Sequence, residues 1–184
     1  MNEVTEAFGR LRRIITATDP DGKSEIMIDD GPAATFLSGD VAGLFEIWSD
    51  QSHGPLETSK TTDQAAGKPI LSPASGKVKI RWFSIAPNDG SIPEETIREM
   101  TRAAFVEMGA GDHQPDTRKP PAMHVTDTLD AIILIKGQVK LILDKEETII
   151  GPGDVVVQRA TNHAWEVVSG EPALFVAVLM DRSG

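Results

Sequence analysis

The chain has 184 residues, of which 40% are hydrophobic and 25% are charged, and its formal net charge at pH 7 is -10. This length and composition fit one globular domain with a sizeable core, whereas the acidic balance disfavours nucleic acid and anionic membrane surfaces as partners, because both need clustered Lys and Arg. The absence of Cys excludes disulfides, thiolate catalysis and Cys-ligated metal sites, and the absence of Tyr excludes phenol-based acid–base chemistry.

No positively charged segment followed by an apolar run opens the chain, so we expect no signal peptide. The longest apolar runs, such as 131–135 and 173–180, are too short to span a bilayer. The sequence therefore predicts a cytoplasmic protein without a membrane partner.

The N-terminal strands are expected between about residues 10 and 48. Residues 14–18 and 25–28 predict a β-hairpin, because the turn sequence Asp-Pro-Asp-Gly lies between them. Residues 44–49 predict a further strand. Residues 50–76 are rich in Ser, Thr, Asp, Gly and Pro and have few large apolar groups, which predicts a long loop.

One strand and one helix follow this loop. Residues 77–85 alternate between apolar and polar, which places Val78, Ile80 and Trp82 on one side and Lys77, Lys79 and Arg81 on the other. Residues 91–108 predict a helix, because Ser91 and Glu94 match a capping box and a Gly-Ala-Gly sequence ends the pattern. Its Met- and Phe-containing face is interpreted as core packing and not as a cofactor site.

The last third of the chain predicts short strands separated by turns, at 131–135, 138–143, 147–150, 155–157, 163–168 and 173–180. This spacing is typical of an antiparallel sandwich or barrel. We therefore expect an all-β protein with one domain spanning residues 1–184 and a core barrel at about 77–181.

A row of polar side chains precedes the first of these strands. In an extended segment, alternate residues share a face, so the residues on this face are His124, Thr126, Thr128 and Asp130, followed by Ile132 and Leu134. A row that starts polar and becomes apolar is typical of a barrel strand with a site at the mouth of the barrel.

His163 and Trp165 share one side of a later strand that could face this row. His124, Asp130 and His163 would then form a set of two imidazoles and one carboxylate, which binds Fe(II) and similar divalent ions and leaves coordination positions open. The alternative is two separate histidines, each hydrogen-bonded at the end of a strand.

These residues resemble the motifs of the cupin superfamily. The first cupin motif has His-x-His, three or four residues, Glu, six residues and Gly; here Thr126 replaces the second His, Asp130 replaces the Glu and Gly137 stands at the Gly. The second motif runs from a Gly through Pro-x-Gly to a His. Here His163 stands at that His, although the Pro is missing and Ala160 replaces the later Gly.

Segments 123–130 and 153–165 look like those of a bacterial subgroup of small, uncharacterised cupin-domain proteins. The resemblance covers residues 120–181 well and 10–184 loosely. It implies a jelly-roll barrel that is often dimeric, and together with the exposed edge of an open sheet it leads us to expect a homodimer. Loops 50–76 and 109–122 are candidate lids for the barrel mouth.

Three functions remain open. A metal-dependent oxygenase or lyase would hold Fe, Mn, Ni or Zn at His124, Asp130 and His163, with Thr126, Thr128 and Trp165 binding a small organic substrate. Alternatively, the chain is a non-catalytic small-molecule binding or sensing module with a degenerate metal site and no cofactor. In the third, catalysis needs no metal and uses His124 or His163 as a general base.

Overall fold

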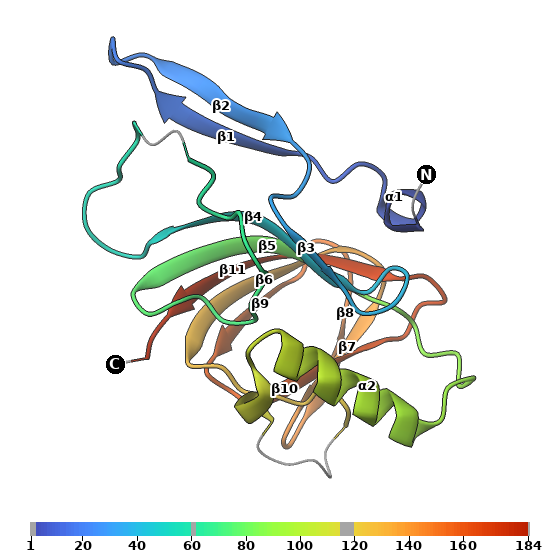
Figure 1. Ribbon diagram of the computed structural model, residues 1–184. Helices are drawn as coiled ribbons and strands as arrows, with labels where there is room; N and C mark the ends of the chain where they lie inside the picture. Colours follow the sequence, from blue (N-terminus) through green and yellow to red (C-terminus); the bar gives the residue numbers. More distant parts are fainter. Residues whose placement is uncertain (1–2, 60–61, 115–119, 184) are drawn as a thin grey trace.

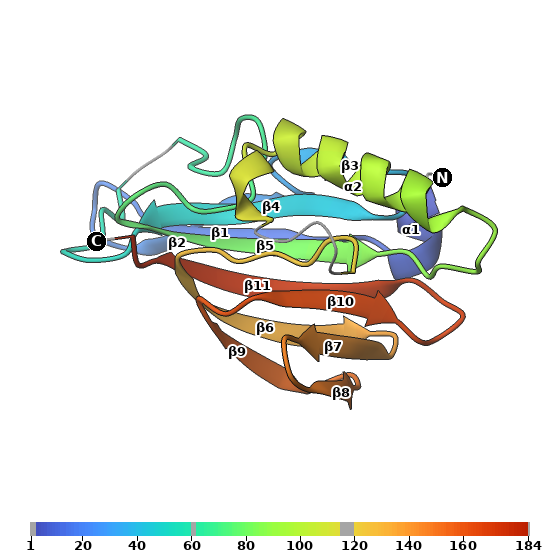
Figure 2. The ribbon, with the colours of Figure 1, turned by 90° about the horizontal axis from the view of Figure 1, so that it is seen from below.

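Two antiparallel sheets face each other across the core of the computed structural model, which describes residues 3–59, 62–114 and 120–183 (Figures 1 and 2). The larger sheet has, in spatial order, β3 (Thr35–Leu37), β4 (Gly43–Gln51), β5 (Lys77–Ile85), β11 (Ala173–Asp181), β6 (Thr128–Lys136) and β9 (Val155–Arg159). The smaller sheet has β10 (His163–Val167), β7 (Val139–Leu143) and β8 (Glu147–Ile150). This arrangement confirms the predicted all-β jelly-roll fold.

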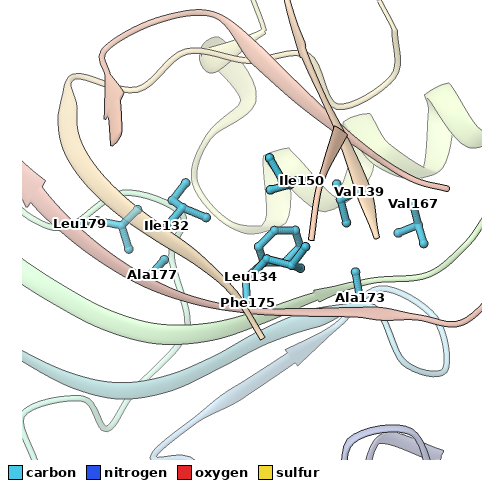
Figure 3. Packing of buried hydrophobic residues seen from close by; sticks show 9 residues of the cluster. All are labelled: Ile132, Leu134, Val139, Ile150, Val167, Ala173, Phe175, Ala177 and Leu179. Carbon is cyan, nitrogen blue, oxygen red and sulfur yellow. The ribbon is translucent and has the colours of Figure 1, made fainter. Parts of the chain in front are cut away.

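The core between the sheets follows from the alternation along β6. Along this strand, Ile132 and Leu134 are buried, while Ile135 is 48% exposed on the opposite face. Phe175 of β11 and Val139 of β7 complete the same cluster from the two sheets. Figure 3 shows the side chains of this cluster pointing into the space between the sheets.

A tight turn links the two sheets at Gly137, which has a φ of +91°. A Cβ at this position would lie 3.0 Å from Cα and Cβ of Ala173. Both the backbone conformation and the close approach of β11 therefore require glycine here.

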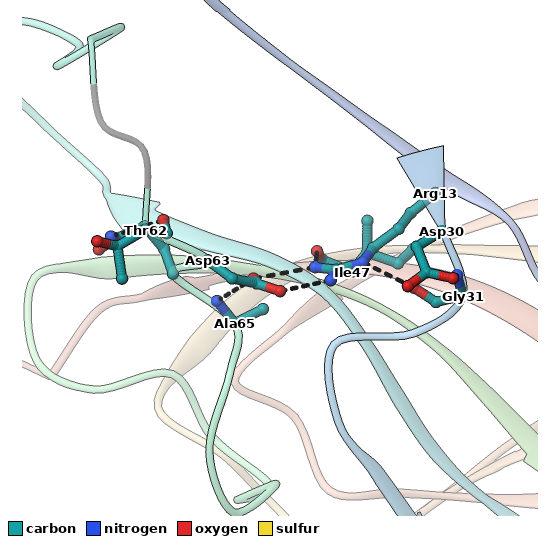
Figure 4. Close-up of polar contacts among 8 residues, drawn as sticks. Arg13, Asp30, Gly31, Ile47, Thr62, Asp63 and Ala65 are labelled. Carbon is teal, nitrogen blue, oxygen red and sulfur yellow. Dashed lines mark hydrogen bonds and ion pairs between the residues drawn. The ribbon is translucent and has the colours of Figure 1, made fainter. Parts of the chain in front are cut away.

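The predicted N-terminal hairpin is present as β1 (Arg13–Thr18) and β2 (Ser24–Asp30), which form a separate two-stranded sheet. Arg13 fastens it to the larger sheet, because its guanidinium donates to the carbonyl oxygens of Gly31 and Ile47 and forms an ion pair with Asp63 (Figure 4). Arg13 is buried, so this contact is structural.

The main helix, α2 (Glu94–Glu107), confirms the predicted helix but begins later than expected. The capping box was wrong: Pro93 is the N-cap residue and no side chain caps the helix, while the amide of Ser91 bonds to the Asp89 carboxylate in the preceding turn. The pattern analysis missed two short helices, α1 (Glu3–Phe8) and the 3-10 turn η1 (Gly111–His113), and the three-residue strand β3.

Loop 50–76 contains no helix or strand beyond Gln51 in its described part, as its composition predicts. Residues 60–61 and 115–119, within the two candidate lid loops, lie outside the described residues. None of the helices in the described ranges is long and apolar enough to cross a membrane.

Leu134→Ala should lower the free energy of unfolding by about 3 kcal/mol, because it removes a fully buried side chain from a packed core. Ile135→Ala, one residue away on the exposed face, should change it by less than about 0.5 kcal/mol. Urea unfolding of both variants checks this, and equal losses would contradict the assignment of the inner face of β6.

Candidate functional site

A cavity of about 250 Å³ lies between the two sheets and helix α2. Most of its walls are apolar, with side chains from β4, β5, β10, β11 and α2 that include Leu44, Phe83, Trp165, Leu179, Phe105 and Met108. Its charged or ionisable lining side chains are His124, Asp130, His163 and Arg81. The cavity therefore suits a small, largely apolar molecule with a few polar atoms.

The structure brings His124 and His163 together by pairing their backbones. The amide of each residue donates to the carbonyl of the other, at 3.0 and 2.9 Å, which makes an isolated antiparallel bridge between the segment before β6 and strand β10. Their ring centroids are 4.3 Å apart. Directly opposite residues on paired strands carry side chains on the same face, so both imidazoles lie at one wall of the cavity.

Both imidazoles are held in the same way. Nδ1 of His124 lies 2.7 Å from the carbonyl oxygen of Ala122, and Nδ1 of His163 lies 2.9 Å from that of Thr161. A carbonyl only accepts, so Nδ1 carries the proton in each ring and Nε2 keeps its lone pair. The hydrogen bonds of the two rings to described residues are those of Nδ1, so each Nε2 lone pair is left for another partner.

The turns before the two histidines are strained in the same way. Ala122 and Ala160 have φ angles of +65° and +49°, and they are the non-glycine residues with positive φ in the described part of the chain. The left-handed conformation costs a residue with a Cβ about 1 kcal/mol. Ala122 lies two residues before His124 and Ala160 lies three residues before His163, in the turns whose backbone carbonyls orient the two rings.

Burial keeps both imidazoles neutral. Burial is the largest cause that lowers the pKa of His124 to about 3, and the neighbouring His163 contributes to the same decrease. Burial also lowers the pKa of His163 below its ordinary value. A histidine with so low a pKa is a poor general base at neutral pH, so this pair is better suited to accepting hydrogen bonds.

An arc of rings runs from the helix through the histidines to the larger sheet. Successive ring centroids are 4.3 to 5.7 Å apart along the series Phe105, His124, His163, Trp165 and Phe175, and Phe83 stacks on Phe175 at 4.4 Å. Edge-to-face and offset contacts of this kind stabilise the placement of each ring. The arc fixes the imidazoles against an aromatic wall.

Asp130 lies on β6 in the larger sheet and is 3% exposed. Burial raises its pKa to about 6, although the Thr128 hydroxyl and Arg81 oppose this rise. Its Oδ1 atom is buried and has no hydrogen-bond partner within residues 3–59, 62–114 and 120–183. Burial therefore brings the pKa of the Asp130 carboxyl close to neutral pH.

The two threonines of the predicted row have different positions. Thr126 lines the cavity, whereas Thr128 is not among the lining residues and its hydroxyl lies 2.7 Å from that of Thr126. Thr128 is therefore placed to support Thr126 and Asp130 and not to touch a ligand. Of the other histidines, His53 is exposed, and Nε2 of His113 lies 3.2 Å from Oγ of Ser72.

Sequence reasoning missed a buried charged cluster on the inner face of the larger sheet. Glu46 of β4 lies directly opposite Arg81 of β5 on the paired strands. The two side chains form an ion pair, with 2.7 Å between Oε1 of Glu46 and Nη2 of Arg81. Lys79 is also buried, which lowers its pKa to about 8. The alternation along β5 indicated that the basic side chains share a side, but gave no signal that this side faces inward.

The predicted three-ligand metal set is not assembled by these side chains. In the residues that the structure describes, no group of three His, Cys, Asp or Glu side chains is placed to hold a metal ion. His124 and His163 are adjacent, while Asp130 belongs to the facing sheet. The donor set therefore does not fit a three-ligand metal centre in this arrangement.

Comparison with known proteins places cupin-domain proteins among the relatives of this chain, although no protein-family model matches it. A cupin-domain-containing oxidoreductase of Aspergillus ruber is 40% identical over 74 residues, which cover 38% of this chain and 36% of that protein. A second cupin-domain-containing oxidoreductase, of Hypocrea virens, is 42% identical over 74 residues, which cover 38% of this chain and 37% of that protein. The chain thus spans little more than a third of the length of these relatives.

Among solved structures, a cupin family protein of Methanocaldococcus jannaschii with a double-stranded β-helix fold has a TM-score of 0.36 at 15% identity, covering 57% of this chain and 71% of that one. A putative ethanolamine utilization protein of Salmonella typhimurium has a TM-score of 0.43 at 9% identity. The match covers 95% of this chain and 98% of that one. The curated relatives are fungal, so they do not confirm the expected bacterial, uncharacterised subgroup. Together with the fold, their names support the cupin superfamily.

Asp130→Asn should stabilise the protein at high pH more than at low pH. Because burial raises the folded pKa from 3.8 to about 6, the folded state binds more protons than the unfolded state between these values, and stability falls as pH rises through this range. The increase in the free energy of unfolding caused by Asp130→Asn should approach about 3 kcal/mol above pH 6 and vanish below about pH 4. Urea unfolding across this range checks it.

Asp127→Asn is the matched control, because Asp127 is exposed on the same segment. A difference between wild type and Asp130→Asn that is independent of pH would contradict the assignment.

Proposed function

We propose that the chain is a small-molecule enzyme that binds a largely apolar organic compound bearing a carbonyl or hydroxyl oxygen in the barrel and transfers a proton on it. The observation that carries this proposal is the largely apolar cavity, which is lined by two imidazoles that hold their proton on Nδ1 and by a buried carboxylate.

Each polar residue has a distinct role in the proposal. Asp130 is the proton acceptor and donor, because a pKa of about 6 lets its carboxylate take up and release a proton near neutral pH. Nε2 of His124 and Nε2 of His163 accept hydrogen bonds from the ligand. The metal-free alternative from the sequence had His124 or His163 as the general base. In the present proposal, Asp130 is the general base instead.

The apolar walls set the chemical class of the ligand. A cavity of about 250 Å³ with Phe83, Phe105 and Trp165 in its walls favours a compact cyclic or aromatic compound. The relatives are named oxidoreductases. A redox reaction here would need an electron acceptor or donor in addition to these residues, so the proposal is limited to the proton-transfer step.

A non-catalytic binding or sensing module is the second candidate. The incomplete ligand set and the largely apolar lining favour it, because neither feature requires a reaction. The metal-dependent oxygenase or lyase stays a prediction. Stoichiometric Fe, Mn, Ni or Zn in protein purified without chelators, lost in His163→Ala, would favour it.

Ligand binding in the cavity is tested with 2-naphthol by titration calorimetry. Ala104→Trp, which places a large side chain from α2 into the cavity, should weaken binding about tenfold or more. Ala103→Trp, on the exposed side of the same helix, should leave it within about twofold. Equal effects of the two substitutions, or no binding by wild type, would overturn this site.

Proton transfer is tested with 2-tetralone in D2O. In the proposed step the Asp130 carboxylate takes a proton from C1, the electron pair of the C–H bond moves toward the carbonyl oxygen, and a deuteron returns to C1. Exchange followed by proton NMR should be faster with wild type than in buffer and should fall about 100-fold with Asp130→Asn. Binding without faster exchange would favour the non-catalytic alternative.

A further inference from the structure

Arg81 is a cation on the floor of the cavity, with a side chain that is 2% exposed. Its strand, β5, pairs with β11 so that Arg81 lies opposite Ala177, and Ala177 lies opposite Ile132 of β6. The small Ala177 side chain leaves the guanidinium room on the inner face. Arg81 therefore reaches the same cavity as Asp130 of the same sheet.

Among the described residues, the guanidinium forms its hydrogen bonds through one nitrogen. Nη2 donates to Oε1 of Glu46 at 2.7 Å and to the carbonyl oxygen of Ile70 at 2.6 Å. Nε is buried and has no hydrogen-bond partner, and Nη1 has none among the described residues. A guanidinium has five N–H donors, so the three on Nε and Nη1 have no acceptor among the described residues.

Unused donors on a buried cation are unfavourable unless something else satisfies them. A buried polar group without a hydrogen bond costs about 1–3 kcal/mol, and a charged group costs more. Lys79 offers a contrast on the same strand, because its Nζ bonds to the carbonyl oxygens of Ile70 and Ser72. Within the described residues, the Lys79 ammonium therefore has two backbone acceptors, whereas Nε of the Arg81 guanidinium has none.

We propose that Arg81 anchors an acceptor oxygen of the ligand, a carbonyl or an equivalent group, through the donors that the Glu46 ion pair leaves free. Glu46 balances the charge of the guanidinium, so a neutral oxygen suffices and no anionic ligand is needed. This anchor deepens the proposed function and rests on it. It predicts that the compound carries an acceptor oxygen facing β5, while donors of the compound face the imidazoles.

The test compares 2-tetralone with tetralin, which has the same carbon skeleton without the oxygen. Wild type should bind 2-tetralone about tenfold or more tightly than tetralin, as measured by calorimetry. Arg81→Met combined with Glu46→Gln should remove this preference and leave tetralin binding within about threefold. Glu46→Gln alone is the matched control, because it weakens the same ion pair but keeps the guanidinium, and it should retain the preference.

A second measurement does not depend on the folding of a variant. The infrared carbonyl stretch of 2-tetralone bound to wild type should lie below its frequency in an apolar solvent, because a charged donor polarises the C=O bond. A stretch at the apolar-solvent frequency, an equal affinity of wild type for both compounds, or an unchanged preference in the double variant would overturn the anchor.

The outcomes also separate this anchor from the proposed function. If wild type binds 2-naphthol in the cavity but gains nothing from the oxygen of 2-tetralone, the anchor is wrong and the cavity stands. If wild type binds none of these compounds, the proposed function fails and the anchor fails with it.

Discussion

The site depends on one pair of reciprocal backbone hydrogen bonds, between His124 and His163. These bonds join the segment that enters the larger sheet to a strand of the smaller sheet, so they connect the two halves of the barrel at the wall of the cavity. The positive φ angles of Ala122 and Ala160 and the carbonyl contacts of both Nδ1 atoms surround this bridge. The bridge and these contacts together place both imidazoles at the cavity wall.

A second constraint is the burial of charge on the inner face of the larger sheet. Burying an ion pair such as that of Glu46 and Arg81 gains little stability compared with apolar packing of the same volume, because desolvation offsets the attraction. Asp130 adds a carboxylate on the same face, with a pKa that burial raises. Charges that contribute little to stability, in a cavity with apolar walls, point to ligand recognition.

The row from His124 to Leu134 could be predicted, because burial of one face imposes alternation along β6 and on the segment before it. The inward direction of Arg81 could not be predicted, since alternation shows which residues share a side and only pairing with β4 and β11 decides which side faces the core. The capping box failed at Ser91 because its neighbouring turn takes its amide and the helix begins after Pro93.

The most direct measurement of the central claim is the protonation state of the two imidazoles, read from the 15N shifts of His124 and His163 in long-range proton–nitrogen NMR spectra. We expect both rings to carry the proton on Nδ1, and we expect His124 to stay neutral from pH 8 to pH 5. A proton on Nε2 of either ring, or a His124 ring that titrates near the ordinary value of about 6.5, would contradict the account.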